Sequence, residues 1–137
     1  MVAAVTEAEL RDLLSHVSFT RQFGFKLHSF NDGECTMTVP FQKNFERPGG
    51  VVSGQVYMAA ADVAMWLAIM TRLGKSDGSV TAEMKTNFLS GAREEDILCH
   101  AKILKLGRRL IYGVAECTTL GGKLLTHHTI TYIRADN

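Results

Sequence analysis

The sequence predicts an α+β fold in which an antiparallel six-stranded sheet wraps around one long central helix. Residues 56–71 are apolar on every side at helical spacing, as in a helix buried all round, and they carry one formal charge, that of Asp62. Six other segments have the residue pattern of strands, and short turns connect them. Short hairpin connections make a sheet antiparallel, and an apolar helix needs cover. We therefore expect the sheet to curl around the helix within one domain over residues 1–137.

A short N-terminal helix is predicted over residues 6–17. Thr6 can cap its first turn, and Glu9 stands three residues later as the partner in a capping box. Four apolar side chains recur at helical spacing and share one face: Leu10, Leu13, Leu14 and Val17. The cap and the apolar stripe together predict an amphipathic helix.

Two strands are predicted next, over residues 25–29 and 34–39. The Asn31-Asp32-Gly33 segment between them is typical of a hairpin turn. A connecting segment over residues 40–50 then leads to the buried helix. These first strands are therefore expected to pair with each other and to run antiparallel.

The buried helix is predicted over about residues 53–73, and Gly74 supplies the stop. The last four strands are predicted over residues 79–89, 96–106, 109–119 and 123–134. Glycines stand between them, at Ser90-Gly91, at Gly107 and at Gly121-Gly122. Strands that follow one another in sequence are therefore expected to be neighbours in the sheet.

The composition argues against several classes of function. The formal net charge is +1, with 46% hydrophobic and 21% charged residues, so no basic surface for nucleic acid or for a membrane is expected. The apolar run at 56–71 is shorter than the roughly 20 residues that span a bilayer and contains an acid. The N-terminal segment is acidic and lacks a basic start, so it does not resemble a signal peptide. We expect a cytoplasmic protein.

Neither a metal site nor a nucleophilic triad is predicted. The three cysteines (Cys35, Cys99 and Cys117) are scattered and odd in number, which fits reduced thiols that fill the core. The adjacent His127 and His128 would point to opposite faces of a strand, and no Cys/His spacing is typical of zinc. No nucleophile-elbow sequence supports a Ser-His-Asp triad. The residues therefore predict neither a zinc site nor a serine triad.

Four segments, in this order and spacing, resemble the hotdog-fold acyl-CoA thioesterases of the phenylacetic-acid-degradation type. They are RPGGVVSG at 47–54, AADVAMWLA at 60–68, VTAEMKTNFL at 80–89 and KILKLGRRL at 102–110. The resemblance covers roughly residues 41–132. It implies a sheet wrapped around one helix, dimers whose strands join edge to edge, and hydrolysis of acyl-CoA thioesters without metal or bound cofactor.

The resemblance also implies a site that combines a glycine amide at the start of the central helix with an acid about two turns along. Gly54 and Asp62 match these two positions. Many members of the family have His-Gly-Gly at the helix start, where this chain has Ser53-Gly54-Gln55. The role of that histidine is therefore not carried over to this chain.

Two further residues match positions that assist the reaction in such enzymes. Asn44 is the candidate for an asparagine that holds the thioester carbonyl, and Thr81 for a hydroxyl residue that assists the attacking water. Strand alternation puts Thr81 on the same face as Glu83 and Lys85, opposite the apolar residues. If the apolar face packs on the helix, Thr81 is expected to face away from it and to reach a site at a dimer seam.

The chemistry explains why these residue types are suitable. Thioester hydrolysis develops negative charge on the carbonyl oxygen, and free amides at a helix N-terminus are preorganised donors for that charge. Gly54 lets the backbone approach the substrate closely because it has no side chain. Asp62 can act as a general base on water or as a nucleophile that forms an anhydride. The sequence leaves both routes open.

The spacing of the two residues predicts a homo-oligomer. Eight residues at about 1.5 Å rise separate Gly54 from Asp62 by about 12 Å along the axis. One helix cannot present both groups to a reacting carbon that lies around 3 Å from each. Antiparallel pairing of two helices across a two-fold axis would bring Gly54 of one chain beside Asp62 of the other. We expect a homodimer, or a dimer of dimers, with composite sites.

Other residues are expected to contact the substrate. Gly50 belongs to a turn that walls the acyl site, Ser53 caps the helix or adds a hydroxyl near the oxyanion, and Gln55 follows at the helix start. Arg108 and Arg109 lie in a cationic turn that suits the phosphates of coenzyme A. The acyl pocket is expected to include Tyr57, Met58 and Trp66.

Two other functions stay open on the sequence. A non-catalytic acyl-CoA binding module would keep the fold without turnover. An enoyl-CoA hydratase or dehydratase needs a histidine with a carboxylate, and Ser53 stands where that histidine would serve. The residues also have plainer interpretations: Asp62 as a hydrogen-bonded structural acid, Gly54 as a helix cap, and the Arg108-Arg109 turn as a solvated loop.

Overall fold

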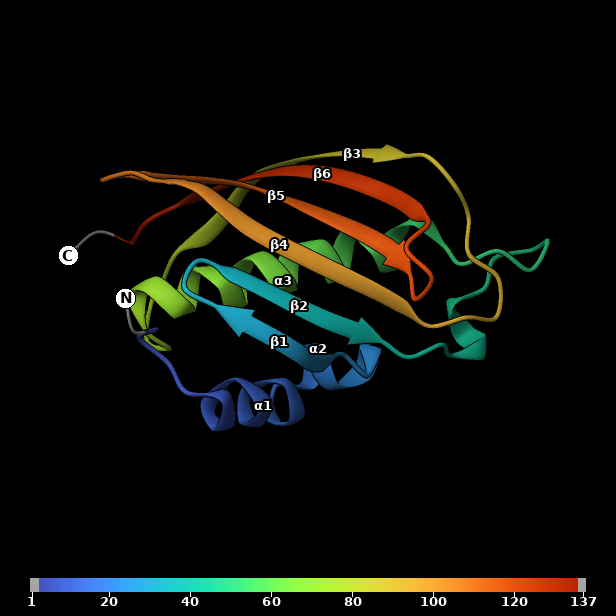
Figure 1. Cartoon of the computed structure of the whole chain (residues 1–137), viewed down its shortest axis with the longest axis horizontal. Coiled ribbons are helices and arrows are strands. Elements are labelled where there is room, and N and C mark those ends of the chain that lie inside the picture. The colour runs from blue at the N-terminus through green and yellow to red at the C-terminus, as the bar shows by residue number, and fades with distance from the viewer. Residues whose placement is uncertain (1–2, 136–137) are drawn as a thin grey trace.

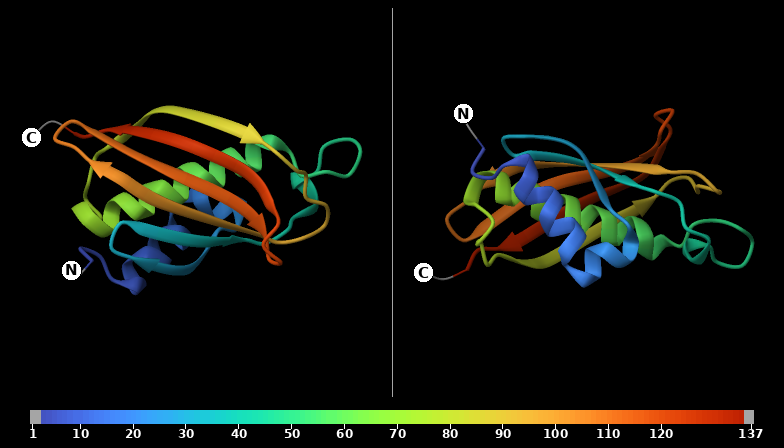
Figure 2. Two further views of the ribbon diagram at one scale, coloured as in Figure 1. Left: turned by 45° about the horizontal axis from the view of Figure 1, so that its top comes forward. Right: turned by 90° about the horizontal axis from the view of Figure 1, so that it is seen from below.

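The computed structural model describes residues 3–135 and confirms the hotdog arrangement, with one long helix held in the curve of a six-stranded antiparallel sheet (Figure 1 and Figure 2). The helices are α1 (Glu7–His16), α2 (Ser18–Phe23), the short 3-10 helix η1 (Lys43–Phe45) and α3 (Gly54–Leu73). The strands are β1 (Lys26–Asn31), β2 (Glu34–Val39), β3 (Val80–Phe88), β4 (Ile97–Leu106), β5 (Leu110–Thr119) and β6 (Leu124–Ile133).

The strands lie in the order β1-β2-β4-β5-β6-β3, and every neighbouring pair is antiparallel. The expectation that consecutive strands are neighbours is correct for β1–β2, β4–β5 and β5–β6, and it is wrong for β3 and β4. Instead of a hairpin, residues 89–96 cross from one side of the sheet to the other. As a result, β3 pairs only with β6 among the strands of residues 3–135 and forms one edge of the sheet, as Figure 1 shows.

The crossing segment is tied to the start of α3. Ala92 is fully buried, its amide donates to the hydroxyl of Tyr57 (3.1 Å), and its carbonyl accepts from the amide of Val52 (3.0 Å). Burial raises the pKa of Tyr57, so this hydroxyl stays protonated. The two bonds hold the loop before α3 and the first turn of α3 in one position.

The central helix forms the core, but it is not buried all round as the sequence predicted. Most of its residues are inaccessible, whereas one strip along its length is exposed or half-buried. The strip consists of Gln55, Met58, Ala59, Asp62 and Trp66. These positions recur every three to four residues, and the sheet curls around only the rest of the circumference. The one acid of the helix therefore lies on its uncovered side.

By length and composition, the 20-residue α3 could cross a membrane, so the expectation that the apolar run is too short is wrong. However, 67% of its most apolar window is buried inside the fold. A core helix of a soluble protein passes the same test of length and composition. Gly74 ends the helix as predicted, with a φ of +90° and an amide that donates to the carbonyl of Met70 (2.8 Å).

Gly113 in β5 lies against Met65 of the central helix. A Cβ atom added there would lie 2.5 Å from the carbonyl oxygen of Lys102 and would also meet the side chain of Met65. No side chain fits in that space, so glycine permits the close contact between α3 and the centre of the sheet.

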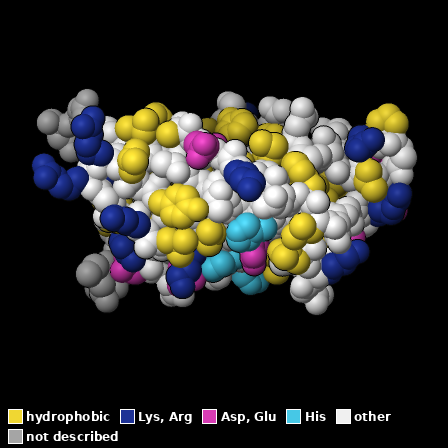
Figure 3. Space-filling model, turned by 90° about the horizontal axis from the view of Figure 1, so that it is seen from above, with side chains coloured by type: hydrophobic (Ala, Val, Ile, Leu, Met, Phe, Trp, Pro, Cys, Tyr) yellow, Lys and Arg dark blue, Asp and Glu magenta, His cyan; other side chains and the backbone are white. Residues whose placement is uncertain are grey.

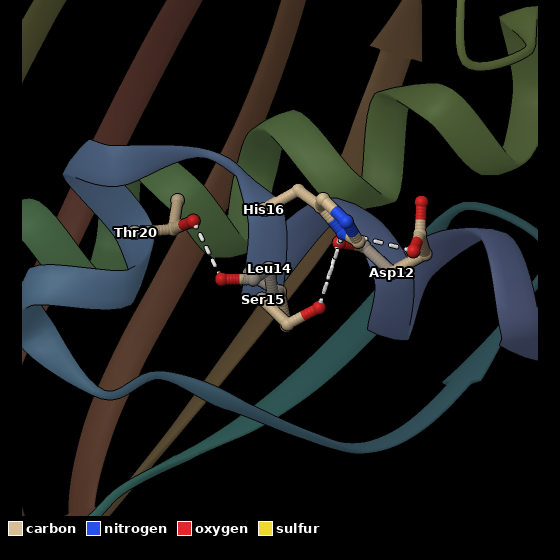
Figure 4. Close-up of polar contacts among 5 residues, drawn as sticks. All are labelled: Asp12, Leu14, Ser15, His16 and Thr20. Atoms are coloured by element: carbon tan, nitrogen blue, oxygen red, sulfur yellow. Dashed lines mark hydrogen bonds and ion pairs between the residues drawn. The ribbon is translucent and has the colours of Figure 1, made fainter.

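The N-terminal helices cover the side of α3 next to β1. The predicted capping box of α1 is confirmed: Thr6 accepts from the amide of Glu9 (3.1 Å), and the Glu9 carboxylate accepts from the amide of Thr6 (3.0 Å). The sequence did not predict α2. Thr20 of α2 is fully buried and donates to the carbonyl of Leu14 (2.9 Å), which joins α2 to the end of α1 (Figure 4). Gly24 in the left-handed conformation ends α2.

The outer face of the sheet is seen from above in Figure 3, where hydrophobic side chains lie among charged ones and histidines gather beside an acid. His127 lies on this face and contacts Glu116 on the neighbouring strand (2.9 Å). His128 is fully buried on the inner face, between the hydroxyls of Thr86 and Thr126, 2.8 Å from each. The prediction that the two histidines face opposite sides is confirmed.

Candidate active site

Asp62 lies half-buried on α3, and two hydroxyl groups converge on it. The hydroxyl of Thr81 donates to its Oδ1 (2.7 Å), and the hydroxyl of Tyr132 donates to the same Oδ1 (2.8 Å) and to the backbone carbonyl of Asp62 (3.0 Å). The carboxylate faces a cavity of about 300 Å³. The other residues that line this cavity are Val17, Phe19, Val63, Trp66, Ser79 and Val80. Asp62 is thus a hydrogen-bonded acid at the wall of a largely apolar cavity.

The expectation that Thr81 faces away from the helix is wrong. Thr81 pairs with Tyr132 on β6, and the next pair joins Glu83 to Thr131, so Ala82 is the extra residue of a β-bulge. A bulge breaks the alternation of side chains along a strand. Thr81 therefore points at α3, on the same side of the sheet as Met84, rather than sharing a face with Glu83.

The second feature is the N-terminus of α3. Gly54 is its first helical residue, and Ser53 is the N-cap without a side-chain capping bond, so the expected capping by the Ser53 hydroxyl does not occur. The amides of Gly54 and Gln55 have no acceptor in the preceding turn or elsewhere within residues 3–135. A Cβ atom at Gly54 would lie 3.0 Å from the ring of Phe88. Glycine therefore lets Phe88 pack beside two free donors.

A cavity of about 460 Å³ opens at this end of the helix. Its lining consists of Arg47, Val51, Val52, Gly54, Tyr57, Phe88, Leu89, Ser90 and Gly91. None of these residues lines the cavity at Asp62. Within one chain the free amides and the carboxylate therefore belong to two separate cavities, as their spacing of about 12 Å along the axis requires.

The other predicted residues lie in various places. Gly50 lines a third cavity of about 610 Å³, which shares Arg47 with the cavity at the start of α3. Asn44 is exposed in η1, and Gln55 is exposed beside Gly54; neither lines any of these three cavities. Of the predicted acyl-pocket residues, Trp66 lines the cavity at Asp62 and Tyr57 the cavity at the helix start, while Met58 is exposed between them.

Arg108 and Arg109 are exposed in the turn between β4 and β5. Figure 1 shows this turn near the C-terminal end of the molecule, at the opposite end from the start of α3. The carbonyl of Arg109 accepts from the amide of Arg134 (2.8 Å), which holds the turn against the end of β6. Within one chain, the two arginines are therefore remote from Gly54.

The structure offers no convincing serine triad in residues 3–135. Asp12, Ser15 and His16 lie together at the end of α1 (Figure 4), but Ser15 and Asp12 both contact the same Nδ1 atom of His16 (3.5 and 2.9 Å). A relay needs the two ring nitrogens to serve different partners. The contact is also in solvent, since the side chains of His16 and Asp12 are 76% and 70% exposed. This cluster is a surface contact of α1.

The described part of the chain presents neither an accessible cysteine thiol nor a cluster of metal-ligating side chains. All three cysteines are buried and unpaired, and none lines a cavity within residues 3–135. Burial raises the pKa of Cys35 to about 12, whereas a hydrogen bond from Cys99 lowers the pKa of Cys117 to about 6, but Cys117 is fully enclosed in the core. No group of three or more metal-ligating side chains lies together between residues 3 and 135. Among the described residues, the carboxylate of Asp62 lines a largely apolar cavity and is a candidate reactive group.

Tyr132 is the one functional candidate that the sequence did not reveal. It stands in a strand rich in threonine and β-branched residues, where a tyrosine is an ordinary core residue. Its contact with Asp62 depends on how β6 pairs with β3 and on the bulge at Ala82. No local pattern predicts that register, so only the assembled sheet identifies this residue.

The fold and these two features define a hotdog-fold hydrolase, with free amides at the start of the central helix and an acid two turns along. Residues 49–126 match the family described as the Thioesterase superfamily, which is more than half of the chain. The chain belongs to this family. Membership assigns it to proteins that hydrolyse esters and thioesters.

Individual relatives agree with the family. A protein of Saccharolobus solfataricus, provisionally named an esterase, is 31% identical over 99 residues, which cover 72% of this chain and 70% of the relative. A solved structure from Silicibacter sp. TM1040, provisionally named a thioesterase, is 30% identical with a TM-score of 0.88, covering 99% of this chain and 96% of that one.

Two more distant structures share the fold. One, from Ralstonia eutropha JMP134, is provisionally named a thioesterase related to phenylacetic acid degradation; it is 20% identical with a TM-score of 0.82 and covers 91% of this chain and 96% of that one. The other, a hypothetical thioesterase from Streptococcus pneumoniae, was solved with coenzyme A; it is 15% identical with a TM-score of 0.74 and covers 82% of this chain and 87% of that one.

Proposed function

We propose that this chain is an acyl-CoA thioesterase that releases a free acid and coenzyme A. The observation that carries the proposal is that a member of the Thioesterase superfamily has both free amides at Gly54 and an accessible carboxylate at Asp62 on its central helix. The amides would stabilise the charge that develops on the thioester oxygen. Coenzyme A is favoured as the thiol because a structure of the same fold was solved with it. Unpaired cysteines favour a reducing compartment such as the cytoplasm.

Asp62 would supply the other half of the reaction. In one route its carboxylate takes a proton from water, the water oxygen attacks the thioester carbon, and the C–S bond breaks. In the other route the carboxylate attacks the carbon, the thiolate leaves, and water hydrolyses the resulting anhydride. Both routes end with the acid, a protonated thiol and a regenerated carboxylate. We expect Asp62→Asn to lower kcat by about 10²–10⁴-fold because an amide is neither base nor nucleophile here.

We further propose that the working enzyme is a homodimer with composite sites. Strand β3 begins at Val80, its second residue Thr81 lies beside Asp62, and it ends at Phe88, beside Gly54. Its outer edge pairs with no strand within residues 3–135, and it exposes large apolar side chains at Val80 and Phe88. Antiparallel pairing of two β3 strands would bring the start of one beside the end of the other. Asp62 of the partner subunit would then approach the free amides.

The cavity at Asp62 is proposed to hold the acyl group. Its walls are mostly apolar, with Phe19 and Trp66 as aromatic members. A volume of about 300 Å³ is at the small end of ligand pockets, which run from about 300 to 1,000 Å³. This size favours a short or aromatic acyl group over a long chain.

Thiol release over a panel of acyl-CoA esters tests the function, with Asp62→Asn beside the wild type. We expect the wild type to release coenzyme A from at least one ester, and Asp62→Asn to lose this activity. Tight binding of acyl-CoA without turnover of any ester would replace the proposal with a binding module. Hydration of an enoyl-CoA without thiol release would replace it with a hydratase.

Mixed dimers test the composite site. Gly54→Pro removes one amide while the helix is kept, because proline is tolerated at the first helical position and Ser53 (φ −63°, ψ 142°) already has the extended conformation that must precede it. Gly54→Ala is the matched control, since it crowds Phe88 in a similar way but retains the amide.

We expect Gly54→Pro to lower kcat by about 10²–10³-fold, as for the loss of an oxyanion donor. Co-expression of Gly54→Pro with Asp62→Asn should restore about a quarter of the wild-type activity, because half of the dimers are mixed and each has one intact site. No recovery in dimers shown to be mixed would exclude composite sites and leave a site within one chain.

A further inference from the structure

The hydrogen bonds to Asp62 distinguish its two carboxylate oxygens. The donors from Thr81 and Tyr132 both end on Oδ1, at 2.7 and 2.8 Å. None of the hydrogen bonds within residues 3–135 ends on Oδ2. No buried side-chain oxygen in that part of the chain lacks a partner, so the unbonded Oδ2 is not buried. One oxygen is therefore held by two hydroxyls, while the other is unbonded and accessible.

The two donors reach the same atom because of the sheet register. Thr81 and Tyr132 are direct partners on β3 and β6, and both face α3. The bulge at Ala82 is what allows Thr81 to face the helix together with Met84 further along the strand. Tyr132 also donates to the backbone carbonyl of Asp62, so its hydroxyl contacts both the side chain and the main chain of one residue.

Tyr132 is suited to act as a permanent donor. It is 4% exposed, and burial followed by the nearby charge of Asp62 raises the pKa of its hydroxyl well above the usual range. The hydroxyl therefore keeps its proton at every pH at which the protein is folded and active. A donor that never ionises holds the carboxylate in one orientation throughout that range.

We propose that Tyr132 is a positioning residue that, together with Thr81, fixes Oδ1 of Asp62 and leaves Oδ2 as the reacting atom. This inference rests on the proposed hydrolase function, because it assigns the atom of Asp62 that acts on the water or on the thioester carbon. Thr81 then serves the carboxylate directly, rather than the attacking water. Neither hydroxyl exchanges a proton during turnover.

The proposal predicts an effect on protonation as well as on rate. Donors to a carboxylate stabilise its charged form, so the loss of one donor makes protonation easier. Activity that needs the carboxylate would then be lost at a higher pH on the acid side. A residue with only a packing role would change the thermal stability without moving the acid limb of the kcat/KM profile.

Tyr132→Phe is the central variant, because it removes the hydroxyl and keeps the ring in the core. We expect kcat to fall about tenfold with KM within about twofold of the wild type, and the acid limb of the kcat/KM profile to move to higher pH. Thr81→Val should act in the same direction, and Thr81→Ser, which keeps a hydroxyl, should restore the wild-type profile. An unchanged kcat and acid limb in Tyr132→Phe would overturn the proposal.

A measurement without turnover separates this inference from the proposed function. In protein labelled with ¹³C at aspartate carboxyls, the resonance of Asp62 is identified by its loss in Asp62→Asn. Its titration midpoint should move to higher pH in Tyr132→Phe, even if the wild type hydrolyses no acyl-CoA tested; that combination would support the hydrogen bonds and reject the thioesterase function. A midpoint that does not move in the folded variant would overturn the positioning role.

Discussion

A charged side chain in an apolar helix needs partners or contact with water, and Asp62 has both. It lies on the uncovered strip of α3, and it accepts bonds from two hydroxyls. An acid held in this way costs the fold little, and its second carboxylate oxygen stays unbonded. The plainer interpretation of Asp62 as a hydrogen-bonded structural acid therefore accounts for Oδ1, which accepts both bonds, but not for Oδ2, which accepts none.

Another single residue, Trp66, is expected to set the size of the acyl pocket. It lies one helical turn beyond Asp62 on the same strip and lines the same cavity. Trp66→Ala would enlarge the cavity, so we expect the preference in kcat/KM to shift toward longer acyl chains by about 10–200-fold, as for a pocket that gains or loses room for a methylene. Thiol-release assays over a series of chain lengths measure the shift.

Met58→Ala is the matched control for that variant. Met58 is on the same strip of α3 but lines no cavity described here, so its removal should leave the chain-length preference unchanged. An unchanged preference in Trp66→Ala would place the acyl group elsewhere.

Among the elements, α1 shows the most direct link between sequence and stability. In the capping box, the side chain of Thr6 accepts from the backbone amide of Glu9, and the side chain of Glu9 accepts from the backbone amide of Thr6. Thr6→Ala removes the side-chain acceptor and should lower the free energy of unfolding by about 1 kcal/mol. For a chain of this size that corresponds to a decrease in Tm of about 3–5 °C by calorimetry. Thr6→Ser retains the acceptor and should be close to the wild type.

The elements could be predicted where local pattern decides them. Thr6 and Glu9 mark the start of α1, Gly74 marks the end of α3, and β2 lies where its alternating residues predict. The short helix α2 could not be predicted, since Thr20 depends on a bond to Leu14 that forms only when α1 is already present. The position of β3 beside β6 could not be predicted either, because the glycine that follows β3 is typical of a hairpin.

The residues of the candidate site also fall into two groups, those that the sequence indicates and those that only the folded structure reveals. Asp62 could be singled out from the sequence because a lone acid in an apolar helix is a local feature, whereas Gly54 became a candidate only through the resemblance to hotdog-fold thioesterases. Tyr132 and the orientation of Thr81 could not, because both depend on the register of β3 against β6 and on one extra residue at Ala82. Long-range pairing of strands leaves no mark in the local sequence.

At the scale of the whole molecule, the sequence of β3 predicts the register in which the β3 strands of two subunits would pair. Antiparallel pairing about Met84, the central residue of β3, would place Glu83 opposite Lys85 of the partner subunit, and Lys85 opposite Glu83 of the partner subunit. The same pairing brings Phe88, beside Gly54, opposite Val80 of the partner subunit. The charges are complementary in this register.

Charge reversal tests that register. Glu83→Lys places like charges opposite each other twice, at a cost of about 0.2–1 kcal/mol per pair, so we expect the dimer Kd to rise about tenfold. Sedimentation analysis over a concentration series measures the change. The double variant Glu83→Lys with Lys85→Glu should restore the Kd of the wild type. If the double variant is as weak as the single one, the copies meet in another register or on another surface.

The crossing segment between β3 and β4 has a consequence for the order of assembly. Ala92 holds the loop before α3, although it follows that loop by forty residues in the chain. Contacts between residues so far apart form slowly, while helical turns form in microseconds or less. During refolding, the helical circular dichroism signal should therefore return before hydrolytic competence. Amide exchange at Val52 should become protected with the later of these two events.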